Sequence, residues 1–429
     1  MDTVLYWIKR LLPNNLIDFL RPTYHRCLAV IGSRLYGNPS KEIFVIAVTG
    51  TKGKSTVTEL VRNILAEDNK KVASLSTIQF RIGEKTKPNL LKMTTPGRFF
   101  IQRFLREAVS EGCTHAVLEL TSEAAKQYRH NFLELDALIF TNLSPEHIES
   151  HGSFENYKNA KLSIAKQLEN SCKQPRYMVA NTDNEHGNDF LSIKVEELLP
   201  YKLSDLTLYT LHKDSISLVL PLGNKETTIR VPLIGLFNVY NSLAAITLTR
   251  AMGVPIETIE KALREMPTIR GRVEIIKSDE KKGKKITAVV DYAHTPDSLE
   301  KLYQAFPCVY KIGVLGNAGG GRDTWKRPEM GEIADRYCDE IILTNEDPYD
   351  EDPRSIVEAM AKGVKNKTKL EIIMDRRLAI NTALKRCRKD GYVIISGKGT
   401  DPFIMGANNH KEPWDDAKVV REEMKVLDI

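Results

Sequence analysis

The stretch that most constrains the fold runs from Phe44 to Thr56 and reads F-V-I-A-V-T-G-T-K-G-K-S-T. Its first five residues are apolar and mostly β-branched, which is typical of a buried parallel strand. A turn with two glycines follows, and apolar residues then recur at the spacing of a helix. A strand, a glycine-rich turn and a helix N-terminus together can cradle a phosphate group, because backbone N–H groups and the helix dipole point at the anion.

The turn departs from the usual phosphate-binding spacing. The pattern G-x-x-x-x-G-K-[ST] would place glycine at position 48, where the chain has Val48. In such a loop the lysine, here Lys54, reaches the terminal phosphates, and the hydroxyl of Ser55 binds Mg²⁺. The alternative is a glycine-rich turn with a solvated lysine. The flanking strand and helix favour the phosphate-binding loop.

The bulk composition is that of an ordinary globular protein. With 429 residues, 42% hydrophobic and 28% charged, the chain is expected to hold two or three domains. The net charge of +6 suits an anionic small molecule such as a nucleotide and does not require a nucleic acid. Six scattered cysteines without metal-ligand spacing indicate free thiols in a reducing compartment, so a cytoplasmic location is expected.

Residues 1–38 mix apolar and basic side chains, among them Trp7, Leu11, Arg21 and Arg34. They lack the clean apolar core and small-residue cleavage site of a signal peptide, and no apolar run is long enough to span a bilayer. A basic amphipathic helix can lie on an anionic membrane surface, here the inner face of the membrane. The alternative is a helix packed against the main body. Residues 1–42 are expected to form this helical extension.

Strands and helices alternate along the rest of the chain. Strands are predicted at 44–48, 71–76, 115–120, 137–142, 286–291, 309–315, 340–344, 370–373 and 392–396, and residues 190–232 are β-rich. This alternation predicts an α/β fold. A central P-loop ATPase-type domain with a mainly parallel sheet is expected over 43–269. A C-terminal Rossmann-like domain with a second, doubly wound parallel sheet is expected over 270–429.

Glu119 ends one of these predicted strands. The carboxyl ends of parallel strands form the ligand-binding edge of such a sheet, so this carboxylate is suited to hold the Mg²⁺ of a nucleotide. Taken singly, His147 and Lys161 are ordinary surface residues, and their value lies in combination with the other motifs.

The ordered motifs resemble those of the Mur ligases, ATP-dependent amide-bond-forming enzymes that include folylpolyglutamate synthase. The resemblance is strongest to the branch that adds the third amino acid to UDP-N-acetylmuramoyl-dipeptide. It rests on motifs between residues 43 and 415. They are T-G-T-K-G-K-S-T (49–56), T-T-P (94–96), Glu119, T-N-L-S (141–144), His147, H-G (151–152), Y-K-N-A-K (157–161), G-L-F-N-V-Y-N (235–241), G-R (271–272), D-Y-A-H-T-P (291–296), G-G-G-R-D (319–323), K-R-P (326–328) and G-K-G (397–399).

The resemblance implies roles for single residues. ATP would be bound by Gly50, Thr51, Lys52, Gly53, Lys54, Ser55 and Thr56, with Asn238 at the adenine and Arg272, Asp291 and His294 from the C-terminal domain. Lys54, Glu119, His147 and Lys161 would be catalytic. Two Mg²⁺ ions would be held by Ser55, Glu119, His147 and Lys161, the last matching the family lysine that is carbamylated. Substrate contacts would fall on Thr94, Thr95, His151, Arg322, Asp347, Tyr349 and Gly397.

Two departures bear on the substrates. The tripeptide-forming branch has an N-terminal domain that grips the UDP-sugar, and residues 1–42 are too few to form one, so a lipid-linked or smaller acceptor is also plausible. The diaminopimelate-selecting branch shows D-N-P-R, whereas this chain has E-D-P-Y at 346–349; Tyr349 replaces the arginine that would grip a distal carboxylate. The chain also has G-K-G-T-D at 397–401 where that branch often has G-K-G-H-E.

These observations predict an ATP-dependent carboxylate–amine ligase that acts in cell-wall peptide synthesis through an acyl phosphate. A small-molecule or peptide-sugar acceptor and an amino acid are the expected partners, without nucleic acid, and a monomer is expected. A folylpolyglutamate-type or other acid–amino-acid ligase is the alternative within the class. A non-catalytic ATP-binding subunit of an envelope complex and a P-loop kinase or ATPase are alternatives from other classes.

Overall fold

The computed structural model describes residues 14–146, 148–223, 225–279, 284–321 and 323–429, so part of the predicted N-terminal extension lies outside it. The chain forms two compact units. The first comprises the described residues up to Glu146 together with His151–Lys202 and Leu243–Ile259. The second comprises 148–150, Leu203–Ser242 and Glu260–Ile429. The domain boundaries expected at 42/43 and 269/270 stay predictions.

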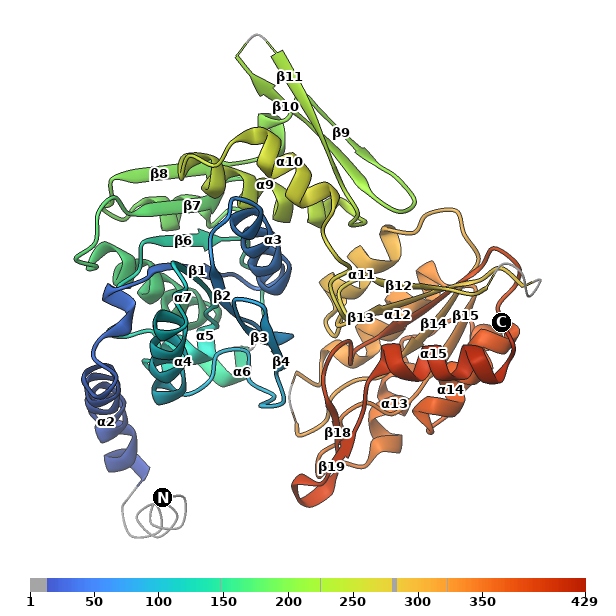
Figure 1. Ribbon diagram of the computed structural model, residues 1–429. Helices are drawn as coiled ribbons and strands as arrows, with labels where there is room; N and C mark the ends of the chain where they lie inside the picture. Colours follow the sequence, from blue (N-terminus) through green and yellow to red (C-terminus); the bar gives the residue numbers. More distant parts are fainter. Residues whose placement is uncertain (1–13, 147, 224, 280–283, 322) are drawn as a thin grey trace. The chain divides into compact units, whose positions relative to one another are not determined.

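The first unit is built on an eight-stranded sheet in the order β4-β3-β2-β5-β1-β6-β7-β8 (Figure 1). Its strands are β1 (Phe44–Thr49), β2 (Val72–Leu75), β3 (Gln79–Ile82), β4 (Lys85–Pro88), β5 (His115–Glu119), β6 (Ala137–Phe140), β7 (Tyr177–Asn181) and β8 (Glu197–Tyr201). All pairs from β2 to β8 are parallel, and only β3 and β4 join antiparallel. The expectation of a mainly parallel sheet is therefore confirmed.

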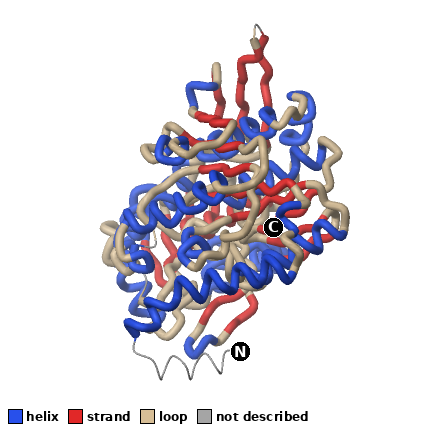
Figure 2. Tube along the Cα trace, turned by 90° about the vertical axis from the view of Figure 1, so that its left-hand side faces the viewer, coloured by secondary structure: helices blue, strands red, loops and turns tan. Residues whose placement is uncertain are grey.

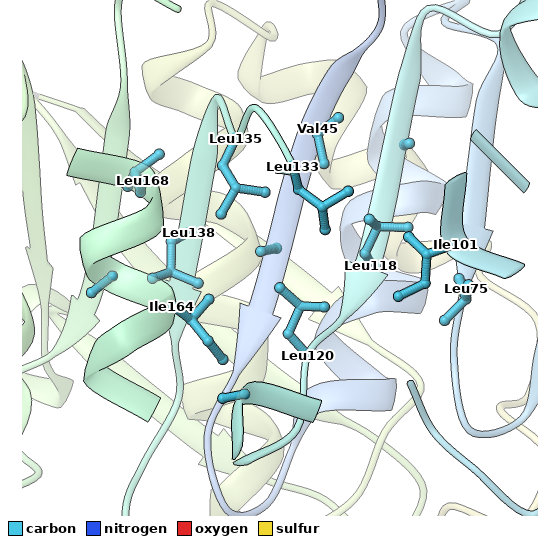
Figure 3. Packing of buried hydrophobic residues seen from close by; sticks show 14 of the residues in the cluster. Val45, Leu75, Ile101, Leu118, Leu120, Leu133, Leu135, Leu138, Ile164 and Leu168 are labelled. Atoms are coloured by element: carbon cyan, nitrogen blue, oxygen red, sulfur yellow. The ribbon is translucent and has the colours of Figure 1, made fainter. Parts of the chain in front are cut away.

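The helices of this unit are α2 (Asn14–Leu35), α3 (Lys54–Glu67), α4 (Arg98–Ser110), α5 (Ser122–Lys126), α7 (Phe154–Glu169) and α8 (Gly187–Leu191), with a 3₁₀ turn η1 (Pro39–Lys41). Helix α2 packs on α4, and residues 148–150 of the short helix α6 (Ile148–His151) belong to the second unit. Strand β1 lies between β5 and β6 and is buried on both faces, which explains its unbroken apolar run. Figure 3 shows Val45 of β1 among Leu118, Leu133 and Leu135, which belong to the same buried cluster.

The second unit holds a six-stranded sheet in the order β12-β13-β17-β14-β15-β16. Its strands are β12 (Glu274–Lys277), β13 (Thr287–Asp291), β14 (Lys311–Leu315), β15 (Glu340–Leu343), β16 (Leu370–Ile372) and β17 (Tyr392–Ser396). The predicted strands of this sheet pair in parallel, as expected, but the sequence analysis missed β12, which pairs antiparallel with β13. Only residues 278–286 separate these two strands, and a parallel crossover needs a dozen residues or more.

Smaller elements complete the second unit. They are the three-stranded sheet β9 (Leu208–Leu211), β10 (Ile216–Leu222) and β11 (Lys225–Val231), the pair β18 (Phe403–Met405) and β19 (Lys411–Pro413), and the helices α11 (Pro296–Gln304), α12 (Lys326–Tyr337), α13 (Pro353–Ala361), α14 (Arg376–Arg386) and α15 (Asp416–Val426). Helices α9 (Leu236–Ala251) and α10 (Ile256–Arg264) each contribute residues to both units. Figure 2 shows the strands in red and the helices in blue. Among the described residues, no helix is long and apolar enough to cross a bilayer.

Candidate active site

The glycine-rich turn lies where β1 ends and α3 begins, and both of its glycines are required. Gly50 has φ +143°, and a Cβ there would lie 2.0 Å from Thr141 Oγ1. Gly53 precedes α3 with φ +86°, a left-handed conformation that glycine adopts without steric cost. The turn therefore brings its backbone, rather than side chains, to the N-terminus of a helix, as an anion cradle requires.

The segment after β6 fixes the turn from the side. Thr51 N donates to Asn142 O (2.8 Å), and Lys52 N donates to Asn142 Oδ1 (3.0 Å). Thr141 Oγ1 donates to Lys52 O at 2.7 Å. These bonds join the turn after β1 to the segment after β6, about ninety residues later in the chain. The pairing of these two strands in the sheet therefore organises the cradle.

Two lysine side chains converge on one carbonyl of this turn. Lys54 Nζ donates to Gly50 O and to Thr51 O, each at 2.9 Å, and Lys161 Nζ donates to Gly50 O at 2.7 Å. The side chain of Lys161 is buried, with 1% exposure. Burial, and next the positive charge of Lys54, hold the pKa of Lys161 well below its usual value, while Glu146 acts in the opposite direction. The fold therefore favours an uncharged amine at Lys161.

Acidic and aromatic groups complete this side of the turn. Lys52 Nζ donates to Glu146 Oε1 at 2.8 Å, and the carboxylate is buried. The hydroxyl of Tyr157 lies 2.9 Å from Thr51 Oγ1, and its ring centroid lies 4.8 Å from Lys161 Nζ. The ring of His151, a predicted substrate residue, meets Tyr157 edge-on with centroids 5.3 Å apart.

Glu119 ends β5, next to β1, and is fully buried. Both of its carboxylate oxygens accept hydrogen bonds from Thr77, one from the backbone N (3.2 Å) and one from Oγ1 (3.0 Å). Thr77 Oγ1 also lies 2.8 Å from Thr94 Oγ1. A chain of hydrogen bonds thus joins the candidate metal carboxylate to a predicted substrate residue.

Sequence reasoning did not identify Thr77. The signal that could have found it is its place two residues after β2, the parallel neighbour of β5. The predicted substrate residue Thr95 is buried, donates from Oγ1 to Glu119 O (2.8 Å) and accepts from Thr121 N (3.1 Å). These bonds make Thr95 a support for the end of β5.

The donor set of the first unit fits a magnesium nucleotide. Ser55 lies in the first turn of α3 and Glu119 at the end of the adjacent strand β5, and both offer the hard oxygen ligands that Mg²⁺ prefers. Lys52 and Lys54 lie at the turn that would receive the phosphates, and Lys161 of α7 contacts it through Gly50 O. Thr56 lies buried in the first turn of α3. Within the described residues, no three His, Cys, Asp or Glu side chains gather into a metal site made by protein alone.

The second unit presents its predicted nucleotide residues at the ends of β12 and β13. Asp291 accepts from Val273 N (2.8 Å) and from Ala293 N (2.7 Å), which fixes its carboxylate. Arg272 lies with its guanidinium carbon 4.8 Å from the Tyr292 ring centroid. His294 Nδ1 donates to Tyr292 O at 2.7 Å. The strand end therefore holds these side chains in fixed positions relative to one another.

A group of buried charges lies at the carboxyl ends of β15 and β17. Lys398 Nζ contacts Asp347 Oδ1 at 2.8 Å and Asp401 Oδ2 at 3.0 Å. A Cβ at Gly397, which has φ +106°, would lie 2.1 Å from Glu346 Oε2, so only glycine leaves room for that carboxylate. Burial raises the pKa of Glu346 to about 7, against the lowering effect of Arg376. Sequence reasoning named Asp347 and Gly397 but did not assign a role to Glu346.

The remaining predicted residues are placed as follows. Asn238 is buried, donates from Nδ2 to Ile234 O (2.8 Å) and accepts from Asn241 Nδ2 (2.9 Å). Tyr349 has φ +53° and donates from its backbone N to Met405 O at 3.0 Å. His147 and Arg322 lie outside the described residues.

Comparisons with known proteins agree with this geometry. The sequence model of the Mur ligase middle domain matches residues 48–249, and that of the Mur ligase glutamate ligase domain matches residues 271–399. The UDP-N-acetylmuramoyl-L-alanyl-D-glutamate--2,6-diaminopimelate ligase of Aquifex aeolicus is 36% identical over 405 residues, covering 92% of this chain and 80% of that protein. The ligase of the same name from Caldanaerobacter subterraneus is 33% identical over 407 residues, covering 92% and 81%.

A solved structure of a ligase with that name aligns with a TM-score of 0.62 and 27% identity, over 90% of this chain and 79% of the other. Sequence matches and fold thus agree along nearly the whole chain. The chain belongs to the Mur ligase family, the ATP-dependent enzymes that form peptide bonds in the synthesis of peptidoglycan precursors.

Proposed function

We propose that this chain joins the amino group of an amino acid to a carboxylate of a muramoyl-peptide acceptor and converts ATP to ADP and phosphate. The observation that carries the proposal is the phosphate turn with Lys54 and Lys161 on the carbonyl of Gly50, beside the buried carboxylate of Glu119. Relatives whose names specify a muramoyl-dipeptide acceptor support the acceptor class. Whether the acceptor must carry UDP is decided by comparing UDP-linked with unlinked muramoyl-dipeptide.

The chemistry of the reaction matches these residue types. The terminal phosphoryl group of ATP passes to an acceptor carboxylate oxygen, and the amine then attacks the carbonyl carbon as phosphate leaves. Negative charge develops on oxygens in both steps, and Lys54 with the N–H groups of the turn would stabilise it. Ser55, Glu119 and His147 would hold Mg²⁺, which supplies charge neutralisation on the phosphates when bound. Thr94, Thr95 and His151 would lie toward the acceptor.

We further propose that Lys161 is carbamylated. Its uncharged amine would attack CO₂ and lose a proton, which turns a buried amine into an anion able to bind Mg²⁺. The lowered pKa and the burial of Lys161 support this, because only the unprotonated amine reacts. Protein incubated with ¹³C-bicarbonate should show a carbamate carbon resonance by NMR, and the Lys161→Met variant should lack it. An identical resonance in the variant would remove Lys161 from this role.

The second unit would supply the other contacts. Asn238, Arg272, Asp291 and His294 are proposed for the nucleotide. Arg322, Asp347, Tyr349 and Gly397 are proposed for the amino acid, whose amino group suits the acidic group around Asp347. Because Tyr349 stands where the diaminopimelate branch has arginine, a neutral or cationic amino-acid side chain is expected.

Three coarser proposals complete the assignment. Residues 1–42, 43–269 and 270–429 are proposed as extension, central and C-terminal domains. A monomer working in the cytoplasm is proposed. Residues 1–38 are proposed to make peripheral contact with the inner face of the membrane, which their basic and apolar composition supports.

The test is phosphate release from ATP with Mg²⁺. Purified protein is supplied with UDP-linked, unlinked and lipid-linked muramoyl-dipeptide, each against a panel of amino acids. Release that requires one muramoyl acceptor and one amino acid supports the proposal. Release with a folate acceptor instead would favour the folylpolyglutamate-type alternative. ATP binding without turnover on any pair would favour a silent subunit.

A further inference from the structure

One face of α2 carries large apolar side chains that the rest of the first unit leaves exposed. Tyr24 is 42%, Ile31 53% and Leu35 69% exposed. Spacings of seven and four residues place them on one side of the helix. The opposite side packs on α4, where Gly32 faces the ring of Phe99 at 3.5 Å from its Cβ position. Helix α2 is thus anchored by one face and presents an apolar stripe on the other.

A pocket of about 310 Å³ opens beside this stripe. It is lined by Val30 and Arg34 of α2, by Lys41 of η1, and by Phe132 and Glu134 of the loop before β6, among others. Phe132 is itself 42% exposed. The pocket therefore combines an apolar wall with two cationic side chains.

The charges of the pocket favour an anion. Within the part of the chain that the structure describes, neither Arg34 nor Lys41 pairs with a carboxylate. Glu134, the acidic group of the lining, already accepts hydrogen bonds from Cys172 N (2.9 Å) and Ser171 Oγ (3.2 Å). The nearby carboxylate of Glu42 is bound by Arg106. The lining of the pocket therefore carries two cations against the single carboxylate of Glu134, whose hydrogen-bond donors are neutral.

Further cationic and apolar residues lie on α2 and precede it in the sequence. Arg26 is exposed on α2, with its guanidinium carbon 5.4 Å from the ring centroid of Tyr128. In the sequence before α2, Leu5, Trp7, Ile8, Leu11 and Leu12 accompany Lys9 and Arg10, with Asp2 as the one acidic residue. Apolar groups flanked by cations are the features by which a helix lies in the interface of an anionic bilayer.

We propose that the docking surface, defined as Tyr24, Ile31, Leu35, Arg34, Lys41 and Phe132, binds an anionic phospholipid bilayer. The apolar side chains enter the boundary between headgroups and acyl chains, and Arg34 and Lys41 contact lipid phosphates. The inference rests on the proposed peripheral membrane contact and gives it a surface and a lipid class. It places the ligase where a membrane-borne acceptor or product is within reach.

The experiment is co-sedimentation of the full chain with vesicles of phosphatidylcholine alone and of phosphatidylcholine with phosphatidylglycerol. Binding should require the anionic lipid and should weaken with salt. The pair Arg34→Glu and Lys41→Glu should lower partitioning by about thirtyfold or more, since each cation near the surface contributes about 1 kcal/mol. The pair Ile31→Glu and Leu35→Glu should lower it at least as much.

Matched controls use exposed residues of the second unit. The pair Lys213→Glu and Lys425→Glu repeats the change of charge at two exposed lysines. Leu378→Glu repeats the apolar-to-acidic change at a helical leucine that is 54% exposed. These variants should bind anionic vesicles like the unchanged protein. Equal losses in the controls, or equal binding to both vesicle types, overturns the surface. Concentration-dependent self-association that Ile31→Glu abolishes would assign the stripe to a second copy instead.

The result of the vesicle-binding experiment can be distinguished from the result of the test for ligase activity. None of the altered residues belongs to the candidate active site, so phosphate release with a water-soluble acceptor should stay within about twofold in every variant. Active protein that ignores anionic vesicles overturns only the docking surface. Vesicle binding by inactive protein overturns only the ligase assignment.

Discussion

The two large sheets share one architecture, yet their carboxyl ends carry opposite charge. In the first unit, the cations Lys52 and Lys54 lie at the turn after β1, beside the buried amine of Lys161. In the second, Glu346, Asp347 and Asp401 gather after β15 and β17. Ligands bind at this end of parallel sheets, so the difference separates two tasks. A cationic end suits phosphates, and an acidic end suits the amino group of an amino acid.

In both units a glycine makes the charged arrangement possible. Gly50 allows the turn to approach Thr141, and Gly397 leaves space for the carboxylate of Glu346. The two ends also differ in how their charges are compensated. Lys398 bridges two acids in the second unit, whereas two lysines share one carbonyl in the first. The first end is therefore the one that gains most from binding an anion.

The largest effect is expected at the cationic end. Lys54→Ala should lower the rate of phosphate release by at least about a thousandfold, because the proposed mechanism places this charge beside the developing phosphate. Lys213→Ala, an exposed lysine of the second unit, is the control and should leave the rate unchanged. Turnover that survives Lys54→Ala would show that the cationic end is not where ATP reacts.

Lys161→Met should lower the rate of phosphate release as much as Lys54→Ala does. The same variant should raise the Tm by a few degrees at pH 7. The pKa of Lys161 is lowered in the fold, so its protonation in the unfolded chain destabilises the protein at pH below the unfolded pKa of about 10.4. The gain in Tm should therefore grow as pH falls and vanish near pH 11. Thermal unfolding at three pH values checks this, and a lowered Tm would contradict it.

Thr77→Val should reduce turnover by about ten- to a hundredfold and raise the Mg²⁺ concentration needed for half-maximal ADP binding. The variant removes the hydroxyl that donates to Glu119 and meets Thr94. Thr77→Ser keeps that hydroxyl and should retain both properties. Calorimetric titration with ADP, with and without Mg²⁺, separates a role at the metal from loss of folding. Equal behaviour of valine and serine variants would make Thr77 merely structural.

The smallest effect is expected on stability, at the acidic end of the second sheet. The folded pKa of Glu346 is about 7, above its usual 4.5, so ionising it in the fold costs free energy that grows from pH 4.5 to 7 and stays constant above. Glu346→Gln should therefore raise the free energy of unfolding at pH 8 by at most about 3 kcal/mol, and by little at pH 4.5. Urea unfolding at both pH values measures it. Equal gains at both would contradict the raised pKa.

Local signals in the sequence were sufficient for the phosphate turn. The apolar run of β1, the two glycines and the helix after them are neighbours in the chain, and the structure has them as predicted. The expected parallel sheets also follow from alternation of strands and helices. The antiparallel β12 was missed because its four residues give little periodic signal.

Contacts between distant segments could not be read in this way. Thr77 contacts Glu119 because β2 pairs with β5, and the sequence of neither strand alone predicts that pairing. The substrate contact of Thr95 stays a prediction, and its hydrogen bonds to the backbone of Glu119 and Thr121 gave no local signal in the sequence. Glu346 received no role of its own because its burial and its closeness to Gly397, fifty-one residues later, arise only in the fold. The roles of the site residues stay predictions until they are measured.

The central claim is that ATP activates the acceptor carboxylate at the cationic end of the first sheet. It is tested most directly by following ¹⁸O from a labelled acceptor carboxylate during a single ligation. The account predicts one ¹⁸O atom in each inorganic phosphate released, because phosphate leaves with the oxygen that it took from the carboxylate, and no release with Lys54→Ala. Phosphate free of ¹⁸O, with the oxygen lost from the carboxylate found in AMP or in water, would contradict it.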